Sequence, residues 1–84
     1  MIHEIIPHKW GKEEIVTSPI YGKVEEIRVK EGEMIIEGQH LLAIINDKGT
    51  LEYLATGVSS LIDSLNVASG DEVIRGDVLL FLKG

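Results

Sequence analysis

The chain of 84 residues contains no cysteine. Disulfide bonds, a thiolate nucleophile and a zinc site built on cysteine are therefore excluded. Because small secreted domains often depend on disulfides, their absence favours an intracellular, cytoplasmic protein. The first residues, Met1-Ile2-His3-Glu4, also lack the basic start and the apolar stretch of a signal peptide.

Aromatic residues, long apolar runs and positive charge are also scarce. Aromatic residues make up 5% of the chain, so a core must be built mainly from Ile, Val and Leu, of which Ile and Val favour strands. No apolar run is long enough to cross a membrane. The formal net charge of −6 argues against nucleic acid, which needs a basic surface. We therefore expect one small domain with neither a membrane nor a nucleic acid as partner.

The chain does contain an internal repeat, and corresponding residues of its two copies are 38 positions apart. Gly32 matches Gly70, and Gly38 matches Gly76. The neighbouring residues follow the same register, with Val29-Lys30-Glu31-Gly32-Glu33 and Leu41-Leu42 in the first copy, and Val67-Ala68-Ser69-Gly70-Asp71 and Leu79-Leu80 in the second. Such a repeat predicts two similar half-modules that share one core around a quasi-twofold axis.

Strand signals recur from Ile15 onward and are separated by glycine turns. The segment 59–68 has partial helical spacing, but the repeat aligns it with a strand of the first copy. The fold class is therefore predicted to be all-β, and Gly32 and Gly70 are expected at turns with positive φ. The predicted strands lie at 23–30, 39–45, 50–55, 61–67 and 78–82, with short bridging segments at 33–38 and 72–75.

The domain is predicted to cover residues 17–84, after an N-terminal extension at 1–16. In the extension, Trp10 is expected to pack over one edge or end of the core. Alternation of apolar and charged residues indicates which face of each strand is buried. The side chains expected in the core are Val24, Ile27, Val29, Leu42, Ile44, Ile62, Leu65, Val67, Leu80 and Leu82.

Between residues 17 and 83 the chain carries spaced motifs. The first half has Ser18-Pro19-Ile20-Tyr21-Gly22-Lys23-Val24, and each half has a Val-x-x-Gly-acidic turn followed by a Gly-x-x-Leu strand start. In these motifs the chain resembles the biotinyl/lipoyl carrier domains. The resemblance implies a flattened β-barrel, a barrel-sandwich hybrid of two quasi-twofold-related four-stranded sheets. It also implies a lysine, at a hairpin tip between the halves, that carries a covalent cofactor.

The resemblance places the attachment lysine at Lys48. Asp47-Lys48 matches the Asp-Lys pair of lipoyl domains, and neither neighbour is the methionine that flanks the lysine of biotinyl domains. Two positions depart from the lipoyl pattern, because Ile45 stands in place of an acidic residue and Gly49 in place of alanine. The implied cofactor is lipoate, and biotin, or no cofactor at all, are the alternatives.

The residues around Lys48 by themselves predict a tight turn. Asn46 suits the first turn position because its side chain bonds to the backbone, and Gly49 suits the fourth. Asp47 and Lys48 then occupy the central positions and point to solvent. A lysine offers a flexible stem and an amine that can be acylated. The same turn sequence suits any protein, so a carrier lysine and an ordinary exposed lysine both fit it.

A carrier of this kind would shuttle acyl or reducing groups between enzyme subunits of a multienzyme complex, after modification by a lipoate- or biotin-attaching ligase. The chain itself is predicted not to be an enzyme. His3, His8 and His40 are too scattered for a metal site, and no catalytic or nucleotide motif is evident. The acidic residues expected to steer the domain toward basic partner surfaces are Glu25, Glu26, Glu31, Glu33, Asp47 and Glu52.

Overall fold

The computed structural model describes residues 1–83, and its regular elements are strands. Among these residues no helix is found that is long and apolar enough to cross a membrane. The strands are β1 (Ile2–Ile5), β2 (His8–Trp10), β3 (Glu13–Thr17), β4 (Gly22–Ile27), β5 (Met34–Ile35), β6 (His40–Ile45), β7 (Leu51–Thr56), β8 (Ser60–Leu65), β9 (Glu72–Val73) and β10 (Val78–Lys83). The all-β prediction is therefore confirmed, and the segment 59–68 contains strand β8.

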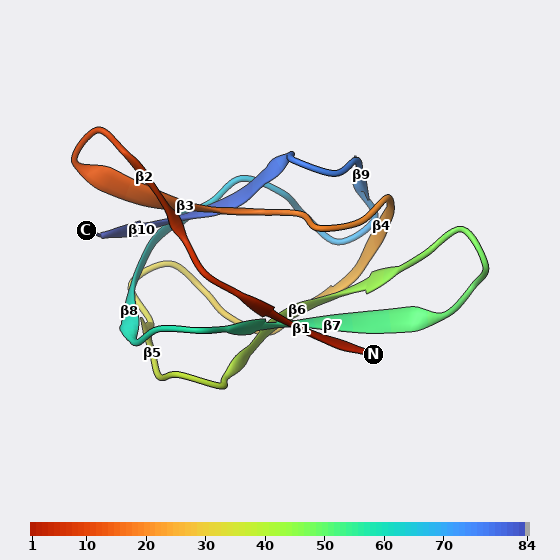
Figure 1. The fold of residues 1–84 in the computed structure, drawn as a ribbon, viewed down its shortest axis with the longest axis horizontal. Helices are drawn as coiled ribbons and strands as arrows, with labels where there is room; N and C mark the ends of the chain where they lie inside the picture. Colours follow the sequence, from red (N-terminus) through yellow and green to blue (C-terminus); the bar gives the residue numbers. More distant parts are fainter. Residues whose placement is uncertain (84) are drawn as a thin grey trace.

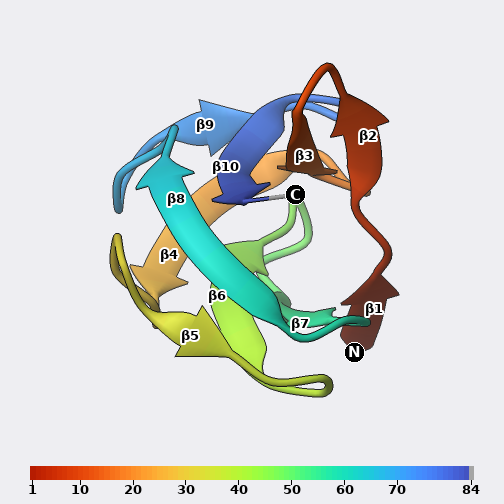
Figure 2. The same ribbon diagram turned by 90° about the vertical axis from the view of Figure 1, so that its left-hand side faces the viewer.

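The strands form two five-stranded sheets that curve around a common core (Figures 1 and 2). One sheet has the order β1-β7-β6-β4-β9 and the other has the order β2-β3-β10-β8-β5. The domain extends 35 × 22 × 18 Å along its principal axes. This is the flattened barrel-sandwich that the sequence predicted.

The quasi-twofold relation between the two halves extends to the bounds of individual strands. Strands β4, β5 and β6 begin and end 38 residues before β8, β9 and β10. The turn hydrogen bonds repeat as well. The amide of Gly32 donates to the carbonyl of Ile62 at 2.8 Å, and the amide of Gly70 donates to that of Val24 at 2.7 Å. Gly32 and Gly70 have φ angles of 83° and 98°, which glycine adopts with little strain, as predicted.

The prediction of four strands per sheet is wrong by one strand in each sheet. β1 pairs in parallel with β7, and β2 pairs in antiparallel fashion with β3. Without these two strands, β7 and β3 would each be an edge with unpaired backbone groups. The N-terminal residues therefore cover one edge of each sheet and link the two sheets, as the path from β1 to β2 shows in Figure 2.

Trp10 lies on the outside of a sheet rather than over the core. Its ring stacks on that of Phe81, with ring centroids 6.3 Å apart, and 61% of the residue remains exposed. Leu80 and Leu82, the neighbours of Phe81, are both buried. Because side chains alternate along a strand, Phe81 points outward. Trp10, which stacks on it, therefore lies on the same outer face. The expectation that Trp10 packs over an edge or end of the core is wrong in this respect.

The core is aliphatic and lies between the two sheets. Of the ten predicted core residues, Ile27, Leu65 and Val67 are partly buried and pack against the core, while the others are buried. The short strands β5 and β9 add Ile35 and Val73, which occupy equivalent positions in the two halves. Leu41 to Ile44 are buried without interruption, so β6 is covered on both faces as expected.

Leu42→Ala and Leu80→Ala should destabilise the domain by similar amounts. The two leucines are equivalent under the repeat and are 1% and 0% exposed. Each truncation should cost about 2–5 kcal/mol of unfolding free energy, measured by urea denaturation. The control Ile36→Ala, at a residue 67% exposed, should change it by no more than about 0.5 kcal/mol. A large cost at one leucine with a negligible cost at the other would contradict a shared core.

Candidate functional site

The hairpin between β6 and β7 carries Lys48 at its tip and extends to one end of the molecule (Figure 1). The amide of Gly49 donates to the carbonyl of Asn46 at 3.0 Å, and the amide of Asn46 donates to the carbonyl of Thr50 at 2.9 Å. Asp47 and Lys48 therefore occupy the two central turn positions, as predicted. Gly49 has a φ of 79°, which explains why glycine stands where alanine would be strained.

The amine of Lys48 is available for chemistry. Lys48 and Asp47 are both exposed. Within residues 1–83, the ion pairs are His3–Glu52 and Arg28–Glu26, and neither involves Lys48. An unpaired lysine on a rigid hairpin combines a mobile amine with a fixed base, which suits covalent modification by an enzyme. This geometry does not by itself distinguish a carrier lysine from an ordinary turn lysine.

Asn46 fixes the turn through its side chain. Its Oδ1 accepts hydrogen bonds from the amides of Lys48 at 3.0 Å and Thr50 at 2.9 Å. Its Nδ2 donates to Glu52 at 2.6 Å. All three bonds are made by one side chain, so Asn46 couples the backbone on both sides of the tip to strand β7.

Glu52 is buried, and the prediction that it belongs to an acidic steering surface is wrong. Its exposed fraction is 8%, and its carboxylate lies against the His3 ring of β1 as well as Asn46. The sequence contained a signal for this, since Glu52 lies in phase with the buried Leu54 and Thr56 of the same strand. The hydrogen bonds from His3 and Asn46 lower the pKa of Glu52 below its ordinary value.

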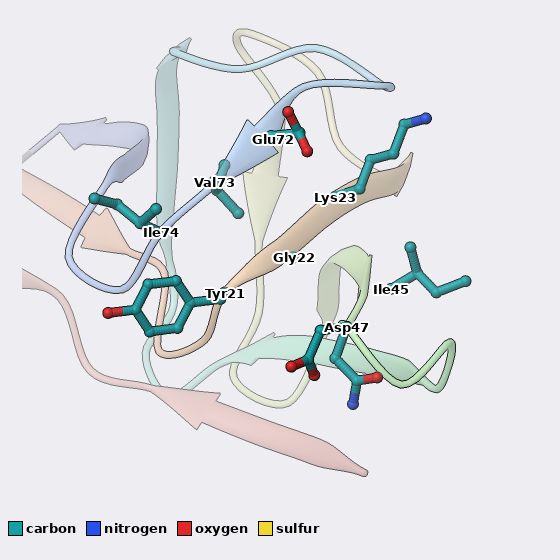
Figure 3. A pocket seen from close by; sticks show the side chains of 9 residues that line it. Tyr21, Gly22, Lys23, Ile45, Asp47, Glu72, Val73 and Ile74 are labelled. Atoms are coloured by element: carbon teal, nitrogen blue, oxygen red, sulfur yellow. The ribbon is translucent and has the colours of Figure 1, made fainter.

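Two open grooves lie beside the hairpin. One has a volume of about 450 Å³ and is lined by apolar side chains such as Tyr21 and Ile74, together with the charged Lys23, Asp47 and Glu72 (Figure 3). The other, of about 300 Å³, is lined by Lys48 and Arg75 among others. Exposed apolar patches rimmed by polar residues often mark sites that contact other proteins or ligands.

The first groove depends on a close approach between two strands. A side chain on Gly22 of β4 would collide with the carbonyl of Ile45 and the side chain of Ile44. Glycine at this position lets β4 lie against the end of β6, just before the Lys48 turn.

The three histidines lie in separate surroundings. His3 bonds Glu52, and His40 begins β6 and stacks on Tyr53 with ring centroids 5.3 Å apart. His8 is exposed on β2. In the part of the chain that the structure describes, no group of three or more His, Cys, Asp or Glu side chains is arranged to hold a metal ion.

The comparisons with known proteins agree with this geometry. No family model matches the chain. The chain is 35% identical over 60 residues to the dihydrolipoyllysine-residue acetyltransferase component of the pyruvate dehydrogenase complex from Pseudomonas aeruginosa. The match covers 71% of this chain but 11% of that protein, so the chain spans about a ninth of this relative's length.

Solved structures share the fold. The lipoyl domain of the 2-oxoglutarate dehydrogenase complex from Azotobacter vinelandii superposes with a TM-score of 0.67 at 22% identity, and the match covers 76% of this chain and 80% of that one. The sequence relative and the shared fold support a biotinyl/lipoyl attachment domain. Domains of this family are carriers without catalysis of their own, which agrees with the prediction that the chain is not an enzyme.

The same fold occurs inside carboxylases. A single-chain, multi-domain long-chain acyl-CoA carboxylase superposes on this chain with a TM-score of 0.79 at 24% identity, over 90% of this chain and 8% of that one. The urea carboxylase of Kluyveromyces lactis gives a TM-score of 0.76 at 19% identity, over 89% of this chain and 6% of that one. The fold alone therefore does not select between lipoate and biotin.

The buried carboxylate predicts a pH dependence of stability. Because the pKa of Glu52 is lowered on folding, its ionised form stabilises the folded state above its ordinary value of 4.5. That contribution should be lost as the pH falls through the folded-state pKa. In urea denaturation at a series of pH values, the stability difference between wild type and Glu52→Gln should shrink as the medium becomes acidic. Glu25→Gln, at an exposed carboxyl, should show no comparable trend; a constant difference for Glu52→Gln would contradict the assignment.

Proposed function

We propose that this domain is a lipoyl carrier, in which the Nζ atom of Lys48 forms an amide with the carboxyl group of lipoate. The observation that supports this most directly is the exposed Lys48 at a central position of the β6–β7 turn, preceded by Asp47. The protein would supply position and partner recognition, while the dithiolane ring of the cofactor would carry acyl groups and electrons.

Lipoate is favoured over biotin by the residues beside the lysine and by the sequence relative. Neither Asp47 nor Gly49 is the methionine of biotinyl domains. The relative at 35% identity is a component named for its dihydrolipoyllysine residue. Both observations rest on sequence, the first on the residues beside Lys48 and the second on a relative at 35% identity. The similarity to the two carboxylases is below 25% identity and shows only a shared fold.

Biotin is the second candidate, and one observation favours it. The two carboxylases match 90% and 89% of this chain, against 76% for the lipoyl domain. Matches of that length must include part of the first 16 residues, which form β1, β2 and the start of β3. A biotin carrier would use the same Lys48 amine and carry a carboxyl group instead.

Labelling by purified ligases separates these candidates. We expect a lipoate-attaching ligase, and not a biotin-attaching ligase, to add one cofactor per chain, detected by intact-mass measurement. Lys48→Arg should abolish the addition, because arginine keeps the charge but is not acylated. Lys30→Arg, at another exposed lysine, should leave it unchanged. Biotin addition at Lys48 would replace lipoate in the proposal, and no addition by either ligase would favour an unmodified interaction module.

The partners of a lipoyl carrier would be the attaching ligase and the enzyme subunits of a multienzyme complex. The acidic surface that could meet them consists of Glu25, Glu26, Glu31 and Asp47, all exposed. Glu33 is half-buried, and its carboxylate accepts hydrogen bonds from Lys30 and Gln39. Glu33 therefore contributes less to this surface than the sequence suggested, and Glu52 contributes nothing.

Association with a basic partner surface should slow as salt rises. Raising the ionic strength from about 0.05 to 0.5 M shortens the range of charge steering several-fold. Stopped-flow measurement of ligase binding should show this decline, and the double variant Glu25→Gln with Glu26→Gln should show a shallower one. A rate that is independent of salt in the wild-type domain would rule out steering by these residues.

A further inference from the structure

Three side chains connect the Lys48 turn to the first strand of the domain. His3 of β1 and Asn46 of the turn bind the two different oxygens of the Glu52 carboxylate. Because a carboxylate only accepts hydrogen bonds, Nε2 of His3 must carry the hydrogen of that bond. The Oδ1 atom of Asn46 in turn accepts hydrogen bonds from the backbone amides of Lys48 and Thr50. A continuous path of hydrogen bonds therefore runs from β1 to the backbone of the lysine itself.

The Glu52 carboxylate is buried, and removing a charged group from water costs free energy. Within residues 1–83, Glu52 is the only charged side chain that is buried. Burying a carboxylate is unfavourable unless hydrogen bonds replace the water it loses. Both oxygens have such partners here, at 2.5 Å from His3 and 2.6 Å from Asn46. Removal of one partner would leave a buried charge incompletely bonded, so the three side chains act as a unit.

Within residues 1–83, which the structure describes, this network has no counterpart in the other half of the repeat. Some side-chain hydrogen bonds do recur in both halves, such as Glu33 to Lys30 with Asp71 to Ala68, and Ser18 to Ile20 with Thr56 to Val58. Others, such as Ser69 to Glu25, occur in one half. The equivalent of Glu52 is Glu14, which makes no side-chain hydrogen bond within the described residues. The fold therefore does not need the network for its repeated architecture, and the network lies only at the end that carries Lys48.

We propose that His3, Glu52 and Asn46 are positioning residues that hold the Lys48 turn in the one conformation that the attaching ligase accepts. This rests on the proposed carrier function of Lys48. A turn that is already ordered spares the ligase the entropic cost of ordering it, and so raises the rate of attachment at low ligase concentration. The first strand, which lies outside the motifs shared with the family, thereby contributes to the site.

An exchange of the amide and the carboxylate tests this proposal. Asn46→Asp keeps an oxygen for the Lys48 and Thr50 amides but places a second carboxylate against Glu52. Glu52→Gln alone puts an NH2 group where His3 or Asn46 already donates. In the double variant Asn46→Asp with Glu52→Gln, the new amide at position 52 donates to the new carboxylate at position 46 and accepts from His3. Every bond of the network is then restored.

Two measurements separate the order of the turn from the attachment reaction. Hydrogen exchange reports the order of the turn, and kcat/KM reports attachment by the ligase. We expect each single variant to lower kcat/KM for ligase attachment about fivefold, and to speed hydrogen exchange at the Lys48 and Thr50 amides by a similar factor. The double variant should recover both values to within about twofold of wild type. His3→Ala should act in the same direction as the single variants, because Glu52 then keeps one partner.

Thr56→Val provides a control for general destabilisation. Thr56 is buried, its hydroxyl bonds the backbone of Val58, and it lies at the far end of β7 from Lys48. Its replacement should lower the melting temperature while leaving attachment unchanged. Attachment rates that follow melting temperature in all variants, or a double variant no better than the singles, would overturn the positioning role. A wild-type domain that neither ligase labels would instead overturn the carrier function.

Discussion

Neither half of this protein can complete a sheet without the other, and the rest of the structure depends on that constraint. β4 and β6 of the first half lie between β7 and β9 of the second, and β8 and β10 of the second lie between β3 and β5 of the first. The glycine turns add reciprocal ties, since Gly32 bonds the carbonyl of Ile62 and Gly70 that of Val24. Most of the strand pairings of each half are made with strands of the other half. We therefore expect the two halves to fold together in one cooperative transition.

The same arrangement explains why the lysine is where it is. The β6–β7 hairpin is the connection between the two halves, and its strands are interior members of one sheet because β1 covers the outer side of β7. A tip that projects from two interior strands has a rigid base. The four-carbon stem of Lys48 then supplies the mobility, while the turn supplies the position. The Glu52 carboxylate on β7 supports the turn because it accepts a hydrogen bond from the Asn46 side chain.

The sequence predicted the features that the repeat encodes. Equivalent glycines and leucines predicted the positions of most strands along the chain, the positive-φ turns and most of the core, because the same pattern appeared twice and each copy checked the other. The turn at Lys48 was predictable from local chemistry, since Asn46 and Gly49 have specific turn preferences. The all-β fold followed from both together.

Residues 1–12, which form β1 and β2, have no second copy against which to read them. The pairing of β1 with β7 joins residues about fifty positions apart in parallel, and no local signal in a short strand specifies such a partner. The burial of Glu52 was missed for a related reason, because its partner His3 lies on that same strand. The alternation with Leu54 and Thr56 indicated an inward direction, but a lone charge at the end of a strand is usually solvated.

The measurement that tests the central claim most directly is tandem mass spectrometry of the peptide that contains Ile45 to Thr50, from protein purified from its native host. The account predicts a lipoyl amide on the Nζ atom of Lys48, with the other lysines unmodified. A peptide that carries a free Lys48, while the cofactor is absent or is attached to another lysine, would contradict it.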